Sequence, residues 1–412
     1  MTTWVRLLLS ALIAAHGLLH LLGAAKGLGL AQVAQLKQPI STGSGFAWAM
    51  ASVMVLLAAA ALAARVDWWW TVALLAALLS QAVIVTSWQD AKAGTALNVV
   101  LLLAAAYGFA AHGPMSYDAE WKQRSAAALT LTDAPTGVVT EEDLAALPAP
   151  LAGYLRRTGA VGAPRVASFS ATFHGRIRSG ADQAWMPFTG QQVNTYGSAP
   201  RREFLLHASR SGLPVTVLHV FEDGRATMRG RLLSAIPVMD ASGPEMDRGE
   251  TVTLFNDMVV LSPAALIDAP VTWTTLSASK VEGTFTLGSE SVAATLTFDR
   301  NHDLVDFASD DRLRASSDAL SFTRQTWSTP VSAYRQFGSR RVAAEAEALW
   351  HAPEPEGQFT YAELTIDTIT FNPTVSEPRV IERAPGQASL PPAAHETVHV
   401  RVHGKGARKI RI

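Results

Sequence analysis

Four long apolar segments at the start of the chain restrict its fold more than any other feature. Each is about 18–21 residues long, enough for a helix to cross a hydrocarbon core of roughly 30 Å. Tryptophans near several of their ends are typical of the headgroup level. The sequence therefore predicts a multi-pass protein of the cell membrane. The predicted spans run from Trp4 to Ala25, from Phe46 to Ala64, from Trp68 to Trp88 and from Thr95 to Ala111.

The charges beside these segments bear on orientation. Four spans place both ends of the chain, and the large domain after the spans, on one side of the membrane. Positive residues are more frequent on the cytoplasmic side of membrane proteins. The bias here favours a cytoplasmic large domain: Arg6, Arg65, Lys122 and Arg124 lie on the side of the termini, against Lys26, Lys37 and Lys92 on the other.

Polar side chains inside the predicted spans form a first candidate site. His16 and His20 are one helical turn apart, Gln81 lies in the third segment and Asn98 in the fourth. Such groups are costly in lipid, so they should face the interior of the bundle. They could form a metal, haem or proton site, or they could form hydrogen bonds between helices. We favour hydrogen bonding, because a bis-histidine haem normally draws its ligands from two helices.

Composition excludes several classes of function. The chain of 412 residues has a net charge of −1, which gives no support to nucleic-acid binding. It contains no cysteine, which excludes thiolate catalysis, cysteine-ligated zinc and iron–sulfur clusters. No phosphate-binding loop, dinucleotide fingerprint or nucleophile elbow is present. Neither a cofactor nor a metal is predicted.

The remainder of the chain is typical of a water-exposed β-rich domain. Residues 113–138 are predicted to be a linker, residues 139–372 the β-rich domain and residues 373–412 a disordered basic tail. Apolar and polar residues alternate through Val281–Leu287 and Val292–Phe298, the pattern of strands with one buried face. About ten such runs predict a large curved antiparallel sheet. The fold class is therefore a four-span helical bundle followed by an α+β domain with a half-barrel-like sheet and one or two packed helices.

One helix is predicted to interrupt the strands, over residues 244–260. Pro244 suits its first turn, and Val252, Phe255 and Val259 form an apolar row. Glu250 and Asp257 lie two turns apart on another side. Paired carboxylates can serve acid–base catalysis, although acids near an arginine more often form buried ion pairs. They are the candidate catalytic residues.

Four stretches carry a resemblance to a known family: His16–Gly23, Ser87–Gly94, Gly243–Met258 and Trp327–Tyr334. They resemble an uncharacterised bacterial membrane-protein family, a domain-of-unknown-function group with spans followed by a β-rich domain. The resemblance implies this architecture and no activity. A curved sheet around a helix is also similar, in fold alone, to lipoprotein carriers of the bacterial envelope.

The tail contains a motif that is typical of zinc proteases. His395-Glu396-Thr397-Val398-His399 fits the pattern HExxH, which binds zinc when it lies on a helix. Two prolines precede it and apolar residues alternate after it, a pattern that favours a strand or a disordered segment. A zinc site is therefore not predicted here.

Three functions remain, and we favour ligand binding over catalysis. In the first, the concave face of the sheet holds a lipid or another apolar small molecule, and membrane lipids are the expected partners. In the second, Glu250 and Asp257 act as an enzyme's acidic pair. In the third, the spans assemble with a protein partner. The aromatic residues expected to line the ligand are Trp273, Phe285, Phe298 and Trp327.

Overall fold

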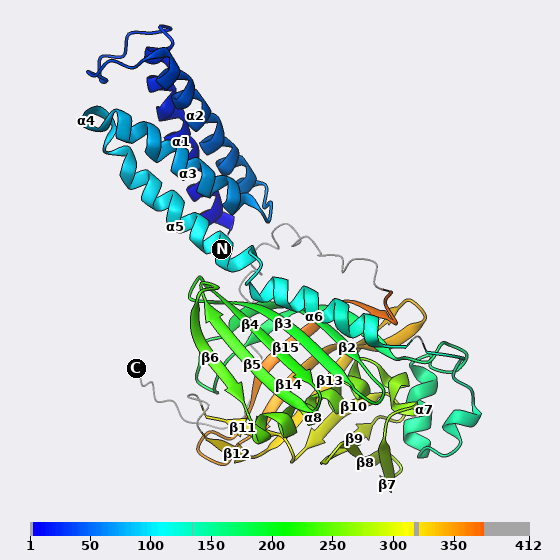
Figure 1. Cartoon of the computed structure of the whole chain (residues 1–412). Helices are drawn as coiled ribbons and strands as arrows, with labels where there is room; N and C mark the ends of the chain where they lie inside the picture. The colour runs from blue at the N-terminus through cyan, green and yellow to red at the C-terminus, as the bar shows by residue number, and fades with distance from the viewer. Residues whose placement is uncertain (1–2, 134, 317–320, 375–412) are drawn as a thin grey trace, which may run out of the picture. The chain divides into compact units, whose positions relative to one another are not determined.

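The computed structural model describes residues 3–133, 135–316 and 321–374, in which apolar helices are followed by a large sheet (Figure 1). Nearly all of the predicted basic tail, including the HExxH motif at His395–His399, lies outside these residues. The predictions made for the tail therefore stay predictions.

Among the described residues, four helices are long and apolar enough to cross a membrane, which matches the predicted number. Consecutive long helices pack side by side along the chain. Small residues permit this close packing: a Cβ atom on Gly23 would lie 2.3 Å from the ring of Trp48. The long helices are α1 (Thr3–Gly27), α2 (Thr42–Ala63), α3 (Trp69–Thr86) and α5 (Gly94–His112), and the short helix α4 (Trp88–Ala91) joins the last two.

The segment predicted to be a linker contains a further helix, α6 (Tyr117–Leu131). The Ser116 side chain caps it by accepting a hydrogen bond from the backbone N–H of Ala119 at 3.1 Å. Trp121 is buried against three neighbouring strands, and its Nε1–H donates to the backbone carbonyl of Glu203 at 3.0 Å. The helix thus packs on the sheet. The helix was not predicted from the sequence, because its apolar face is short.

The main sheet is antiparallel and open and has 13 strands, which confirms the predicted fold class of a large antiparallel sheet. Its order is β6-β5-β4-β3-β2-β1-β15-β14-β13-β10-β9-β8-β7, so β6 and β7 form the edges. A separate pair is formed by β11 and β12. The strands are β1 (Ser168–Ile177), β2 (Met186–Thr195), β3 (Arg201–Arg210), β4 (Leu213–Glu222), β5 (Arg225–Leu232), β6 (Ile236–Ser242), β7 (Val271–Ser277), β8 (Lys280–Leu287), β9 (Glu290–Phe298), β10 (Leu304–Ser309), β11 (Leu313–Ala315), β12 (Phe322–Arg324), β13 (Thr326–Phe337), β14 (Arg340–His351) and β15 (Gln358–Phe371).

Local sequence explains several of these boundaries. Asp223 and Gly224 both adopt positive φ, at 53° and 72°, which matches the hairpin turn between β4 and β5. Two short helices lie on either side of Pro148. The 3₁₀ helix η1 (Glu142–Leu144) precedes this residue, and α7 (Ala149–Arg157) follows it.

The predicted helix over residues 244–260 is confirmed as α8 (Pro244–Val260), followed by the 3₁₀ helix η2 (Pro263–Ile267). Gly243 precedes α8 with φ at 114°, a conformation that favours glycine. Residues 249–260 are all buried. A helix buried on every side must satisfy its polar side chains internally, and those contacts define the candidate site.

Candidate functional site

The two acids of α8 meet one arginine of the sheet. Nε of Arg202 on β3 donates to Asp257 Oδ2 at 2.8 Å, and Nη1 donates to Glu250 Oε2 at 3.3 Å. All three side chains are less than 10% exposed. The structure therefore brings both candidate acids together, through a residue that the sequence analysis did not identify.

Further polar groups complete this network. Asp257 Oδ2 also accepts from Gln192 Nε2 at 2.6 Å and from Asn194 Nδ2 at 2.9 Å, both on β2. Glu250 Oε1 accepts from the hydroxyl of Thr253 at 3.1 Å, and that hydroxyl oxygen accepts a hydrogen bond from Arg312. Two carboxylates face two guanidinium groups, so the buried charge is balanced.

The charges of the network determine what its acids can do. Burial by itself would raise the pKa of Glu250, but the neighbouring His219, Arg202 and Arg312 side chains together outweigh it and hold the pKa below its ordinary value. Burial lowers the pKa of His219 to about 4, so this imidazole is neutral at pH 7, with Nε2 3.3 Å from Glu250 Oε1. An ionised, fully bonded acid has no proton to donate. The contacts match the buried ion pair that the sequence analysis weighed against catalysis.

Aromatic residues surround the other side of α8. The ring of Phe255 lies 5.5 Å from those of Phe285 and Phe307 and 6.1 Å from that of Trp273. The ring centroid of Trp327 in turn lies 6.1 Å from that of Phe307. Three of the four predicted ligand-lining residues therefore gather around α8, which occupies the space assigned to a ligand.

The fourth predicted residue has a different neighbour. Phe298 packs on Tyr154 of α7, with ring centroids 5.6 Å apart, and the Tyr154 hydroxyl donates to the carbonyl of Val259 at 2.8 Å. Phe285, Phe298 and Trp327 are buried in the described conformation, whereas Trp273 on the edge strand is half-buried.

Beyond the polar network, the same face of the sheet becomes apolar. Side chains alternate between faces along a strand, so Phe188 shares the face of Gln192, and Val215 and Val217 share the face of His219. Val215 and Val217 are half-buried. We name this set the β2–β4 apolar strip; it consists of Phe188, Leu206, Ala208, Val215 and Val217.

The predicted intramembrane residues also meet. Asn98 Oδ1 lies 2.9 Å from His16 Nε2, and Asn98 Nδ2 donates to Gln81 Oε1 at 2.9 Å. His20 Nε2 lies 2.8 Å from the hydroxyl of Ser80, which in turn donates to Asn98 Oδ1 at 2.7 Å. Ser80, missing from the sequence analysis, joins all three helices. These are interhelical hydrogen bonds.

The described residues contain no cluster of side chains suited to binding a metal ion. Within residues 3–133, 135–316 and 321–374, no group of three or more His, Cys, Asp or Glu side chains could hold a metal ion.

Comparison with known proteins identifies a family but no activity. The model of a family of unknown function, DUF6544, matches residues 137–364. No curated protein matches the sequence.

Two solved structures are similar at 10% identity. A Vibrio parahaemolyticus domain, described as an outer membrane lipoprotein-sorting protein domain, is similar over 50% of this chain and 85% of its own, with a TM-score of 0.27. A DUF1329 family protein from Desulfovibrio piger ATCC 29098 is similar over 54% and 92%, with a TM-score of 0.31.

Proposed function

Since the chain belongs to DUF6544, a family of unknown function, we propose a function from the geometry alone. The protein is a multi-pass membrane protein whose β-rich domain binds a lipid or another apolar ligand on the inner face of its sheet. The bias of positive residues beside the spans favours a cytoplasmic domain. The proposal differs from the sequence analysis in placing the ligand beside α8 rather than in the space the helix fills.

The observation that carries this proposal is the β2–β4 apolar strip. It continues the face on which α8 lies, yet Val215 and Val217 remain half-buried rather than covered. Leu232, which pairs with Val215 from β5, is half-buried as well. A contiguous apolar surface that stays partly open to water commonly marks a binding site.

The polar network bounds the strip on one side. Gln192 and Arg202 lie on the same face as Phe188 and Leu206, farther along β2 and β3. An apolar chain on the strip would therefore meet polar groups at one end. Trp273, Phe285 and Trp327 lie beyond that boundary, around Phe255. In this proposal they hold α8 in place, and a ligand contacts them only when the helix is displaced.

The absence of native cysteine allows a direct test. Val217→Cys in the full chain would carry a photoreactive benzophenone, and illumination in native membranes followed by mass spectrometry would identify the adduct. We expect a lipid or another apolar molecule attached at this position. Leu276→Cys is the matched control, because Leu276 is an exposed apolar residue on β7, the opposite edge strand.

The outcomes separate clearly. An apolar adduct at residue 217 and none at residue 276 supports the proposal. Equal labelling at both positions, or no adduct at residue 217, contradicts it. Both positions lie in the sheet and not in the apolar helices.

A further inference from the structure

One edge of the sheet exposes apolar residues that the proposed ligand site does not use. On β6, Ile236 is 52% exposed and Val238 55%, and Met239 and Leu213 at the start of β4 are exposed as well. Pro237 lies between the first two and is also exposed. Edge strands usually carry charge or are covered, since an exposed apolar edge invites aggregation. Residues 236–239 carry no charge and are uncovered within the described structure, so Pro237 is the one edge-blocking residue among them.

The opposite edge provides a comparison within the same molecule. On β7, the exposed positions include Thr272, Thr274, Thr275 and Ser277, with Leu276 as the single large apolar side chain exposed on that strand. The two edges belong to one sheet and are both exposed, yet only the β6 edge exposes three large apolar side chains, Ile236, Val238 and Met239, which the exposed Asp240 follows. The difference indicates that β6 faces something other than water.

The exposed residues lie beside the chain segment that leaves the last apolar helix. Arg231, at the end of β5, donates from Nη1 to the backbone carbonyl of Met115 at 3.2 Å. Its guanidinium group also lies over the ring of Tyr117, 4.1 Å from the centroid. Met115 itself is 70% exposed.

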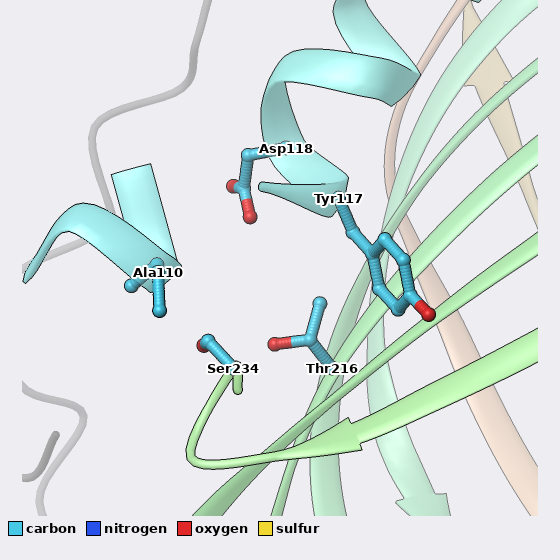
Figure 2. A pocket seen from close by; sticks show the side chains of 6 residues that line it. Ala110, Tyr117, Asp118, Thr216 and Ser234 are labelled. Carbon is cyan, nitrogen blue, oxygen red and sulfur yellow. The ribbon is translucent and has the colours of Figure 1, made fainter. Parts of the chain in front are cut away.

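The turn between β5 and β6 reaches the same segment. Figure 2 shows Ser234 of this turn and Thr216 of β4 opposite Tyr117 and Asp118 of α6, with Ala110 of α5 beside them. The gap these side chains enclose has no room for a water molecule. The hairpin end of β6 therefore lies next to the last turn of α5.

The number of residues between α5 and Met115 limits how far this surface can lie from the end of α5. Met115 follows the end of α5 at His112 by three residues, which span at most about 11 Å. The headgroup layer is roughly 5–8 Å thick on each side of the hydrocarbon core. If α5 crosses the bilayer, the neighbouring apolar residues lie at or just outside the headgroups.

We propose that this edge docks on the bilayer that the same chain spans. We name it the β6 surface; it consists of Met115, Leu213, Ile236, Val238 and Met239. The inference rests on the proposed function, because it takes the four apolar helices as spans. It also specifies the ligand: Val215 on the β2–β4 apolar strip pairs with Leu232, which pairs with Ile236, so the strip joins the β6 surface and receives a membrane lipid from it.

The test places one fluorophore on each edge of the full chain. Ile236→Cys and Leu276→Cys would each carry an environment-sensitive dye, with the protein reconstituted in phosphatidylcholine vesicles. We expect a blue-shifted emission at residue 236 and at least twofold quenching by spin-labelled phosphatidylcholine. Residue 276 should stay in a water-like environment and resist that quencher.

Two results would overturn the inference. Water-like emission at residue 236 without lipid quenching would show that the surface does not touch the bilayer. Emission that changes when the protein is diluted among unlabelled copies would show a contact between chains instead. Either result can occur while Val217→Cys still captures a lipid, in which case ligand binding stands and docking fails. Quenching at residue 236 without lipid capture at residue 217 would mean that docking stands and ligand binding fails.

A paired substitution tests the route of the lipid. Ile236→Asp with Val238→Asp should lower lipid capture at Val217 about fivefold or more, because two charges resist insertion among headgroups and acyl chains. Leu276→Asp should leave capture unchanged. Equal capture in both variants would contradict delivery across the β6 surface.

Discussion

Arg202 and Asp257 are joined across 2.8 Å, from β3 of the sheet to α8 on its inner face. The same guanidinium group reaches Glu250 two helical turns away. One side chain thus joins two turns of the helix to the sheet, and the ion pair of Arg248 with Glu290 of β9 adds a further charged contact. The two acids considered as catalytic residues also connect α8 to the strands in this arrangement.

Asp257→Asn should therefore destabilise the protein strongly. The amide cannot balance the charge of Arg202, and removing one partner of a buried pair typically costs about 3–5 kcal/mol. Hydrogen–deuterium exchange of the full chain in detergent should show faster exchange across α8. Asp240→Asn, at an exposed position on β6, is the control. Unchanged protection of α8 in the Asp257 variant would show that the network is not structural and would revive a catalytic role.

Glu203 gives rise to a second prediction, on the opposite face of the same strand. It is buried beneath α6, and in the described structure neither carboxylate oxygen has a hydrogen-bond partner. Burial raises the pKa of Glu203 to about 8 from 4.5. The charged groups that face it are Arg124 and Glu120 on α6, Glu222 on β4 and Arg201 on its own strand.

The sign of the effect follows from proton binding. Between pH 4.5 and about 8 the folded protein holds a proton that the unfolded chain has lost. The stability that accompanies this proton is fully present below pH 4.5 and is lost as pH rises through about 8. Glu203→Gln, a neutral mimic, should remove this dependence and slow the exchange of α6 at pH 8, with a gain on the order of 4 kcal/mol. An identical pH profile in the variant and the parent would disprove the assignment.

Much of the fold was predictable, because its signals are local. The four apolar helices follow from segment length and composition, and β8 and β9 follow from period-two alternation. The helix α8 follows from Pro244 and its apolar row. The turn at Asp223-Gly224 is readable because few other residue pairs tolerate two consecutive positive φ angles.

The parts that could not be predicted depend on contacts between distant segments. β2 carries Gly190, Gln191, Gln192 and Asn194, a poor strand sequence that is stabilised by β1, β3 and the acid of α8. Arg202 did carry a signal: it shares an apolar face with Phe204 and Leu206, and a cation in such a row requires a buried anion. Sequence alone could not say which anion, since Glu250 and Asp257 are about fifty residues away.

A third prediction concerns Asp303, in the loop between β9 and β10. Arg157 of α7 and Arg341 of β14 each donate two hydrogen bonds to its carboxylate, at 2.6–2.9 Å. Burial would raise the pKa of Asp303, but the two guanidinium groups outweigh it and lower the pKa to about 2. This stability is present above pH 3.8 and is lost as pH falls through about 2.

Asp303→Asn should therefore cost about 1–2 kcal/mol at pH 7, since the amide cannot pair with both arginines. The melting temperature of the variant should approach that of the parent as pH falls toward 2. Asp299→Asn is unsuitable as a control because it caps the same loop, and Asp240→Asn serves better. A constant difference between variant and parent from pH 7 to pH 2 would refute the role of ionised Asp303.

A fourth prediction comes from Gly283 on β8, which leaves room for two rings. A Cβ atom there would lie 2.5 Å from the nearest ring atom of Trp273 and 2.8 Å from that of Phe255. Both rings must shift to admit even a methyl group. Overpacking of this kind typically costs about 1–3 kcal/mol.

Gly283→Ala should therefore loosen α8 through Phe255 while leaving the ion pairs to Arg202 in place. Exchange should quicken around Phe255 more than around Glu250, the reverse of a variant that removes an acid. Gly288→Ala, at a turn with φ of 58° and open space around it, separates backbone strain from crowding, because it strains the chain without touching a ring. If Gly283→Ala and Gly288→Ala affected α8 equally, the aromatic cluster would not be what positions the helix. If Gly283→Ala increased lipid capture at Val217 and Gly288→Ala did not, the position of α8 would control access to the β2–β4 apolar strip.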